Sequence, residues 1–135
     1  MKKYYKIIFS LLIVALVWAN AGCSKSSPID EDGLLITERA ECYVSNFELL
    51  GTDFVTVRSK APVIDTTAGT INVEVFFGTD LKNVYPQFSL ITDAKLEPKI
   101  TGRVDLSDLA NPKTYTVISG NRKVKKAYQV IIKFQ

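Results

Sequence analysis

Two aspartates are the residues of this 135-residue chain that come closest to supporting acid–base chemistry. Asp105 and Asp108 lie three residues apart in the turn-like sequence DLSDLA. Carboxylates in such a position usually accept hydrogen bonds from backbone N–H groups, so a capping role is favoured over catalysis. The chain contains no histidine, the residue that zinc hydrolysis and Ser-His or Cys-His catalysis usually recruit. The sequence therefore predicts a protein that is not an enzyme and has no metal or other cofactor.

Two further segments do not match the sites that they superficially suggest. Residues 118–121 read ISGN and lack the glycine spacing of a nucleophile elbow. Residues 30–33 read DEDG and lack the alternating ligands and the distant glutamate of a calcium loop. No glycine-rich phosphate-binding loop is present in the sequence. The function must therefore be sought in binding rather than in reaction chemistry.

The N-terminal residues 1–22 have the pattern of a secretory signal peptide. Three lysines precede an apolar run of 15 residues at positions 7–21, and small residues stand at the end of this run. As a helix this run would rise about 22 Å, which is short of the roughly 30 Å hydrocarbon core of a bilayer. A cleaved signal is therefore predicted, with an uncleaved anchor helix as the alternative.

The signal ends at a cysteine whose neighbours define its role. The residues from Asn20 to Cys23 resemble a bacterial lipobox, in which small residues precede a cysteine that becomes the acylated N-terminus. Asn20 departs from the apolar residue preferred there. The resemblance implies that Cys23 is lipidated and that it attaches the protein to a membrane. A disulfide to Cys42 is the alternative; otherwise Cys42 is an unpaired, small apolar residue.

The charge of the chain after cleavage argues against nucleic acid as a partner. Removing residues 1–22 takes three of the 17 basic residues and leaves 14, equal to the 14 acidic residues. Binding to nucleic acid needs a basic field, which a nearly neutral protein lacks. The one basic run, residues 121–126, lies between two predicted strands and is expected to be a solvated hairpin loop.

Residues 23–39 are expected to form a disordered tether behind the lipidated cysteine. Residues 24–32 are polar and include an acidic triplet at positions 30–32. Fully extended, residues 24–39 would span roughly 50 Å. Acidic residues after the lipidated cysteine resemble the surface-export signal of Bacteroidota lipoproteins. The expected location is the outer membrane, at the cell surface by this resemblance, with the periplasmic face as the alternative.

Residues 40–135 read as a single β domain. Apolar and polar residues alternate with a period of two at 71–77, 114–118 and 128–134, and turn-forming residues separate these runs. No stretch sustains the 3.6-residue period of a helix. About seven short strands of this kind predict an all-β, Ig-like antiparallel β-sandwich.

Several short pieces resemble a known family. They include the stretch VIDTTAGTINVEVFFGTDLKNVYPQFSL, then VDLSDLANPKTYTV and finally KAYQVII. Together they resemble the Ig-like domain of unknown function in Bacteroidota surface lipoproteins, many of which belong to polysaccharide-utilisation loci. The resemblance covers residues 44–134. It implies a β-sandwich at the cell envelope and a role near glycan uptake.

Three aromatic residues are candidates for ligand or partner contact. Tyr115 and Tyr128 lie on the inward phase of their strands, and the only tryptophan leaves with the signal. Tyr43, Phe76 and Tyr85 remain as the exposed aromatics, with core packing as the alternative for each. Exposed aromatic rings are the surfaces on which sugars commonly stack.

A last short motif suggests a modification. The residues from Asp65 to Thr67 resemble the O-glycosylation sequon of Bacteroidota, which implies Thr66 as the acceptor. Taken together, the sequence predicts a lipid-anchored, non-catalytic accessory binding module that assists glycan capture at the outer membrane. The alternative is a structural or protein-interaction module of a surface complex.

Overall fold

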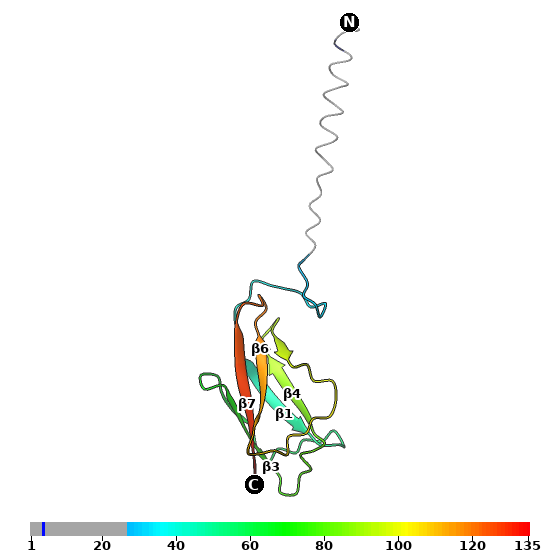
Figure 1. Ribbon diagram of the computed structural model, residues 1–135, viewed down its shortest axis with the longest axis vertical. Coiled ribbons are helices and arrows are strands. Elements are labelled where there is room, and N and C mark those ends of the chain that lie inside the picture. Colours follow the sequence, from blue (N-terminus) through cyan, green and yellow to red (C-terminus); the bar gives the residue numbers. More distant parts are fainter. Residues whose placement is uncertain (1–3, 5–26) are drawn as a thin grey trace.

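The computed structural model describes Tyr4 and residues 27–135 of the chain. Residues 27–135 contain seven strands in two sheets and no helix, which confirms the predicted all-β sandwich (Figure 1). Cys23 and the predicted signal peptide lie outside the described residues, apart from Tyr4. In the part of the chain that the structure describes, no helix is long and apolar enough to cross a membrane.

The strands divide unequally between the sheets. The small sheet pairs β1 (Val44–Leu50) with β4 (Tyr85–Leu90). The large sheet contains, in spatial order, β2 (Val63–Asp65), β3 (Thr70–Val75), β7 (Lys125–Phe134), β6 (Lys113–Ile118) and β5 (Lys95–Glu97). Strands β4 and β5 are therefore edge strands of different sheets.

The expectation of a purely antiparallel sandwich is wrong for one pair of strands. β3 and β7 run parallel, with Ile71 opposite Val130 and Val75 opposite Phe134. After β3 the chain forms β4 in the small sheet. It then returns to the large sheet as β5 and β6, and only after these does it form β7 beside β3. A parallel pair requires such a long crossover, and residues 76–124 provide it.

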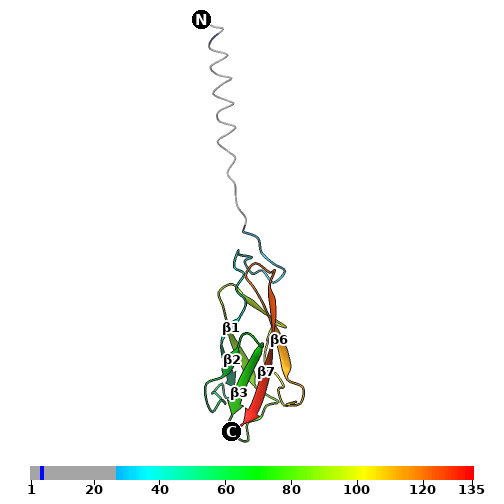
Figure 2. The ribbon, with the colours of Figure 1, turned by 90° about the vertical axis from the view of Figure 1, so that its left-hand side faces the viewer.

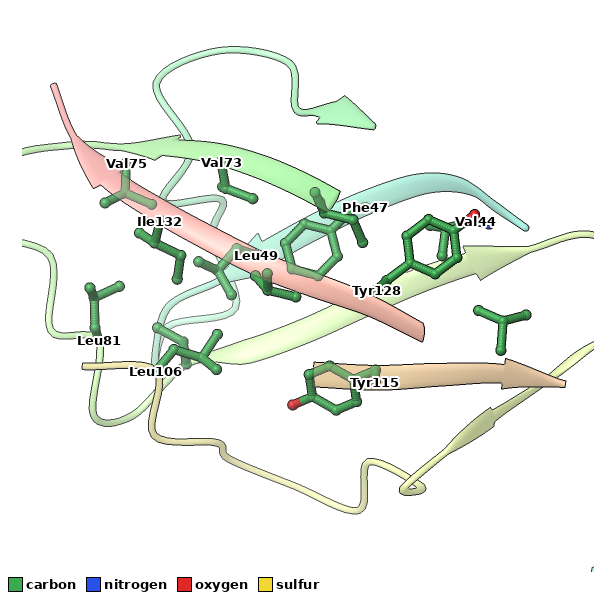
Figure 3. Close-up of a cluster of buried hydrophobic side chains, with 14 residues drawn as sticks. Val44, Phe47, Leu49, Val73, Val75, Leu81, Leu106, Tyr115, Tyr128 and Ile132 are labelled. Carbon is green, nitrogen blue, oxygen red and sulfur yellow. Dashed lines mark hydrogen bonds between the residues drawn. The ribbon is translucent and has the colours of Figure 1, made fainter. Parts of the chain in front are cut away.

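The period-two patterns place one face of each sheet in the core. Phe47, Tyr115 and Tyr128 meet between the sheets, and Figure 3 shows their rings among the valines of the neighbouring strands. Tyr115 and Tyr128 are buried, as the strand phase predicts. The backbone N–H of Val44 donates to the Tyr128 hydroxyl at 3.4 Å, so this buried phenol has a partner.

The predicted alternation of β3 extends two residues too far. The strand ends at Val75, and Gly78 with φ of +84° allows the chain to turn immediately afterwards. Phe77 is consequently 88% exposed instead of inward, and its ring meets that of Phe134 edge-on at 6.4 Å. Phe134 is also partly exposed, so the last position of the β7 alternation is not in the core.

Candidate functional site

A groove runs along the free edge of β4 on the open side of the sandwich. β4 pairs only with β1, and β5 ends the large sheet, so neither strand has a partner on the side where they face each other. The groove has a volume of about 570 Å³, which is in the range of small-molecule sites. Its apolar walls come from β4, β5 and the segments beside them: Leu34, Pro86, Phe88, Leu90, Ala94, Leu96 and Ile100.

A stack of two aromatic rings stands where β4 begins. Phe54 lies on Tyr85 with a centroid separation of 4.7 Å and an interplanar angle of 25°. The Nε–H of Arg103 donates to the Tyr85 hydroxyl at 2.9 Å, and the guanidinium carbon lies 5.9 Å from the ring centroid. Tyr85 lines the groove, so the stack adjoins the groove through this ring.

The backbone of Phe54 adopts a conformation that is unusual for an aromatic residue. Its φ is +59°, in the left-handed region, which costs a non-glycine residue about 1 kcal/mol. A tight turn holds it there: the Phe54 N–H donates to the Gly51 carbonyl at 3.0 Å, and the Val55 N–H donates to the Asp53 carboxylate at 3.1 Å. The side chain nevertheless remains 65% exposed. Strained backbone of this kind is concentrated at functional sites.

An ion pair closes the loop that carries Phe54. Glu48 on β1 accepts hydrogen bonds from the Arg58 guanidinium, including one from Nε at 2.6 Å, and one from the Thr56 hydroxyl at 2.7 Å. The hydrogen bonds from Arg58 lower the pKa of Glu48 to about 2 against the opposing effect of burial. These contacts join both ends of the loop to β1 and fix the position of the aromatic stack.

At the opposite end of the groove, the N-terminal segment is docked on the domain. Asp30 is 4% exposed in its side chain and pairs with Lys95 Nζ at 2.9 Å and with Arg122 Nε at 2.9 Å. The hydrogen bond from Lys95, followed in effect by those from Leu34 and Arg122, keeps the pKa of the Asp30 carboxyl well below its usual range. Asp32 also binds Lys95 Nζ, at 2.7 Å. We call Asp30, Asp32, Lys95 and Arg122 the ion cluster.

Arg122 contributes the largest number of contacts to this cluster. Its guanidinium also donates to the carbonyls of Leu35 at 3.1 Å, Asp93 at 3.0 Å and Ser119 at 2.8 Å. The prediction that the basic run is only a solvated loop is therefore wrong at Arg122, whose side chain is 15% exposed. Backbone hydrogen bonds add to the docking: Thr37 donates to the Gly120 carbonyl and Asn121 donates to the Arg39 carbonyl.

The expected disordered tether is thus corrected for residues 28–39. Ile29 and Leu35 form an antiparallel bridge around a tight turn, and the Asp30 carboxylate accepts from the N–H groups of Asp32 and Leu34. The composition of the segment suggested disorder because it is polar. Its acidic residues instead form ion pairs with distant residues of the domain. Lys95 lies 63 residues after its partner Asp32, and Arg122 lies 92 residues after its partner Asp30.

The docked segment and the aromatic stack lie at opposite ends of the sandwich. The register pairs Tyr85 with Leu50 at one end of the small sheet and Leu90 with Val44 at the other. Figure 1 shows the chain entering at the end next to the β6–β7 turn, and Figure 2 shows the same arrangement from the side. The groove extends from the docked segment to the aromatic stack, because Asp32 and Leu34 of the segment line it together with Tyr85 of the stack.

The three predicted contact residues do not form one surface. Tyr43 and Tyr85 lie at opposite ends of the β1–β4 pair, roughly 23 Å apart along a strand of seven residues. Phe76 is 49% exposed, and its N–H donates to the Val57 carbonyl beside the Phe54 loop. Only Tyr85 lines the groove.

The prediction that Tyr43, Phe76 and Tyr85 are the exposed aromatics is wrong for Tyr85, which is half-buried under Phe54, and it is also incomplete. Phe54 and Phe77 are more exposed than any of them. A signal for Phe54 was present in the sequence, because it directly follows the turn residues Gly51, Thr52 and Asp53.

The other candidates have simpler surroundings. Asp105 and Asp108 accept hydrogen bonds from the N–H groups of Ser107 and Asn111, which confirms their capping role. Cys42 is half-buried, and its thiol donates to the Val117 carbonyl at 3.0 Å. Among residues 27–135, no group of three or more His, Cys, Asp or Glu side chains could hold a metal ion.

Three comparisons relate this chain to known proteins. A family model described as "SGBP, N-terminal" matches residues 52–132. A solved structure of a candidate glycoside hydrolase from Bacteroides thetaiotaomicron is similar with a TM-score of 0.59 and 28% identity, over 71% of this chain and 26% of that one. A DUF4623 family protein from Bacteroides eggerthii shares the fold, with a TM-score of 0.52 and 17% identity over 70% of this chain and 22% of that one. No curated protein sequence matches the chain.

Proposed function

The chain belongs to the family of SGBP N-terminal domains, and from this premise we propose that it is a non-catalytic accessory module that captures glycan at the cell envelope. The family and the Bacteroides neighbours confirm the resemblance to Bacteroidota surface proteins of glycan utilisation. The chain spans about a quarter of the length of the two solved neighbours. The role proposed here therefore rests on this domain's own groove.

The observation that carries the proposal is the exposed aromatic stack that adjoins the groove. A sugar offers an apolar face of C–H groups, and an aromatic ring offers a matching flat apolar surface. The outer face of Phe54 is available for this contact because only its other face packs on Tyr85. The Arg103 side chain and the backbone of the β4 edge supply hydrogen-bonding groups beside the ring.

The arrangement of the domain suits a protein held by its N-terminus. A lipid on Cys23, together with the docking of residues 28–39, would hold the β6–β7 end towards the membrane. The aromatic stack then faces away from the bilayer, where glycans of the medium are accessible. We include outer-membrane attachment and cell-surface location in the proposal on this ground.

Replacing Phe54 by alanine is expected to weaken glycan binding about tenfold, since one stacked ring contributes roughly 1 kcal/mol or somewhat more. Tight binding is not expected from one stack, and millimolar affinity corresponds to only about 4 kcal/mol. Calorimetry of the full-length protein in detergent against a panel of oligosaccharides measures the effect. Phe77→Ala is the matched control, because it removes an exposed ring that meets Phe134 and not the groove residue Tyr85.

The same pair of variants tests a protein-interaction module as the second candidate function. The observation in its favour is that Phe77, Phe134 and Phe76 are all exposed at one end of the sandwich, where a partner could cover them. If Phe77→Ala abolishes crosslinks to a defined outer-membrane protein in host cells, while Phe54→Ala changes neither crosslinking nor glycan binding, this second function replaces the first.

We also propose that Thr66 carries a glycan in a host with the corresponding modification system. Thr66 is exposed in a turn that the Asp65 carboxylate stabilises by accepting from the N–H groups of Thr67 and Ala68 at 2.9 Å. Intact-mass measurement is expected to show a hexose-scale increment on the native protein that is absent in Thr66→Ala. Thr67→Ala is the control, and a native protein that carries only the lipid mass contradicts the assignment.

A further inference from the structure

The positive charges beside the groove are unequally compensated. Within residues 27–135, Lys95 pairs with Asp30 and Asp32, whereas neither Lys99 nor Arg103 forms an ion pair with a carboxylate. Lys99 lines the groove, and Arg103 is bound to Tyr85, which also lines it. The carboxylate of Asp32 belongs to the same groove, at the docked end, and Lys95 neutralises it. Lys99, at the rim that the groove shares with a second pocket lined by Asp32 and Glu97, and Arg103, beside Tyr85, therefore carry positive charges that no ion pair among the described residues compensates.

Arg103 is held in place without losing its charge. Its Nε–H donates to the neutral Tyr85 hydroxyl at 2.9 Å, which fixes the guanidinium near the ring but does not neutralise it. A guanidinium has five N–H groups, so the four on its terminal nitrogens remain for a ligand. Their planar fork matches a carboxylate or a sulfate group better than it matches a single hydroxyl.

Together these features select a chemical class of ligand. We propose that the groove binds an acidic oligosaccharide, with an anionic group of the sugar against Arg103 and Lys99 and a neighbouring sugar face on Phe54. This inference rests on the proposed glycan-binding function and adds its specificity. A uronate carboxylate and a sulfate ester offer the same recognition chemistry, and the experiment separates them.

The test compares each acidic ligand with its uncharged counterpart, using calorimetry of the full-length protein in detergent. The probes are tetragalacturonate with its methyl ester, and a carrageenan tetrasaccharide, which carries sulfate esters but no uronate, with its desulfated form. We expect at least one acidic probe to bind about tenfold more tightly than its uncharged counterpart, because a hydrogen bond to a charged group is stronger than one to a neutral group. Added salt is expected to reduce this preference, since exposed charges are screened.

Variants that remove positive charges show which residues cause the preference for acidic ligands. Lys99→Gln combined with Arg103→Gln is expected to abolish it without changing the thermal unfolding temperature, whereas Lys123→Gln, on the distant β6–β7 turn, retains it. Preference for the carrageenan sulfate alone or for galacturonate alone identifies the anionic group and supports the inference. Equal, Phe54-dependent binding of the uncharged probes and the acids overturns the acidic specificity but leaves the proposed function standing. Absence of binding to any sugar overturns both.

Discussion

Replacing Arg122 by methionine is expected to lower the free energy of unfolding by about 2–3 kcal/mol. The side chain is 15% exposed and holds Asp30 together with several backbone carbonyls, so its loss leaves Asp30 with Lys95 as its only cation at hydrogen-bonding distance. Breaking a buried, hydrogen-bonded charge pair typically costs this much or more. For a domain of this size the midpoint of thermal unfolding should fall by roughly 10 °C.

The same substitution should release the N-terminal segment before the whole domain unfolds. Residues 28–39 are held by the ion cluster, in which Arg122 makes the most contacts, and by a few backbone hydrogen bonds, whereas the core is held by both sheets. Limited digestion with chymotrypsin is therefore expected to cleave after Leu34 or Leu35 much faster in Arg122→Met. Lys123→Met is the matched control, since Lys123 is exposed and its side chain has no carboxylate partner in residues 27–135. Equal cleavage and equal stability of the two variants would show that the ion cluster does not hold the segment.

The strands of the core were predictable because burial on one face leaves a period of two in the sequence. β6 and β7 follow this pattern, and Tyr115 and Tyr128 are buried as it requires. The pattern gives no information on where a strand stops when the next residues are also apolar. Phe77 continues the inward phase of β3, but the turn at Gly78 takes its ring out of the core.

The candidate site was predictable only in part, because it depends on contacts between distant segments. Tyr85 was identified from the sequence as a contact candidate, but its partner Phe54, which half-buries it, precedes it by 31 residues and reaches it only because β1 and β4 are paired. Asp30 and Arg122 each look like solvated surface residues in a polar stretch. Their pairing follows from the docking of residues 28–39 on the β6–β7 turn, which no local pattern encodes.

Replacing Cys23 by alanine is expected to move the protein out of the membrane fraction or to leave an uncleaved precursor of higher mass. The reason is in the sequence: a short apolar run ends in Ala21, Gly22 and Cys23, and without the thiol there is no attachment point for the lipid. Fractionation of host cells followed by intact-mass measurement separates these outcomes. Cys42→Ala is the control, since Cys42 lies on the domain and donates to the Val117 carbonyl. Unchanged membrane association at unchanged mass in Cys23→Ala would contradict the anchor.

The docked segment adds a geometric consequence to this anchor. If residues 24–39 were free, the domain could stand roughly 50 Å from the bilayer. Because Asp30 and residues after it bind the domain, only the chain from Cys23 to Asp30 is left to span the gap, which allows roughly 23 Å. Fluorescence transfer from labelled lipid to a dye on the β6–β7 turn should therefore be efficient in the native protein and decrease in Arg122→Met. No decrease would mean that docking does not set the distance between the groove and the membrane.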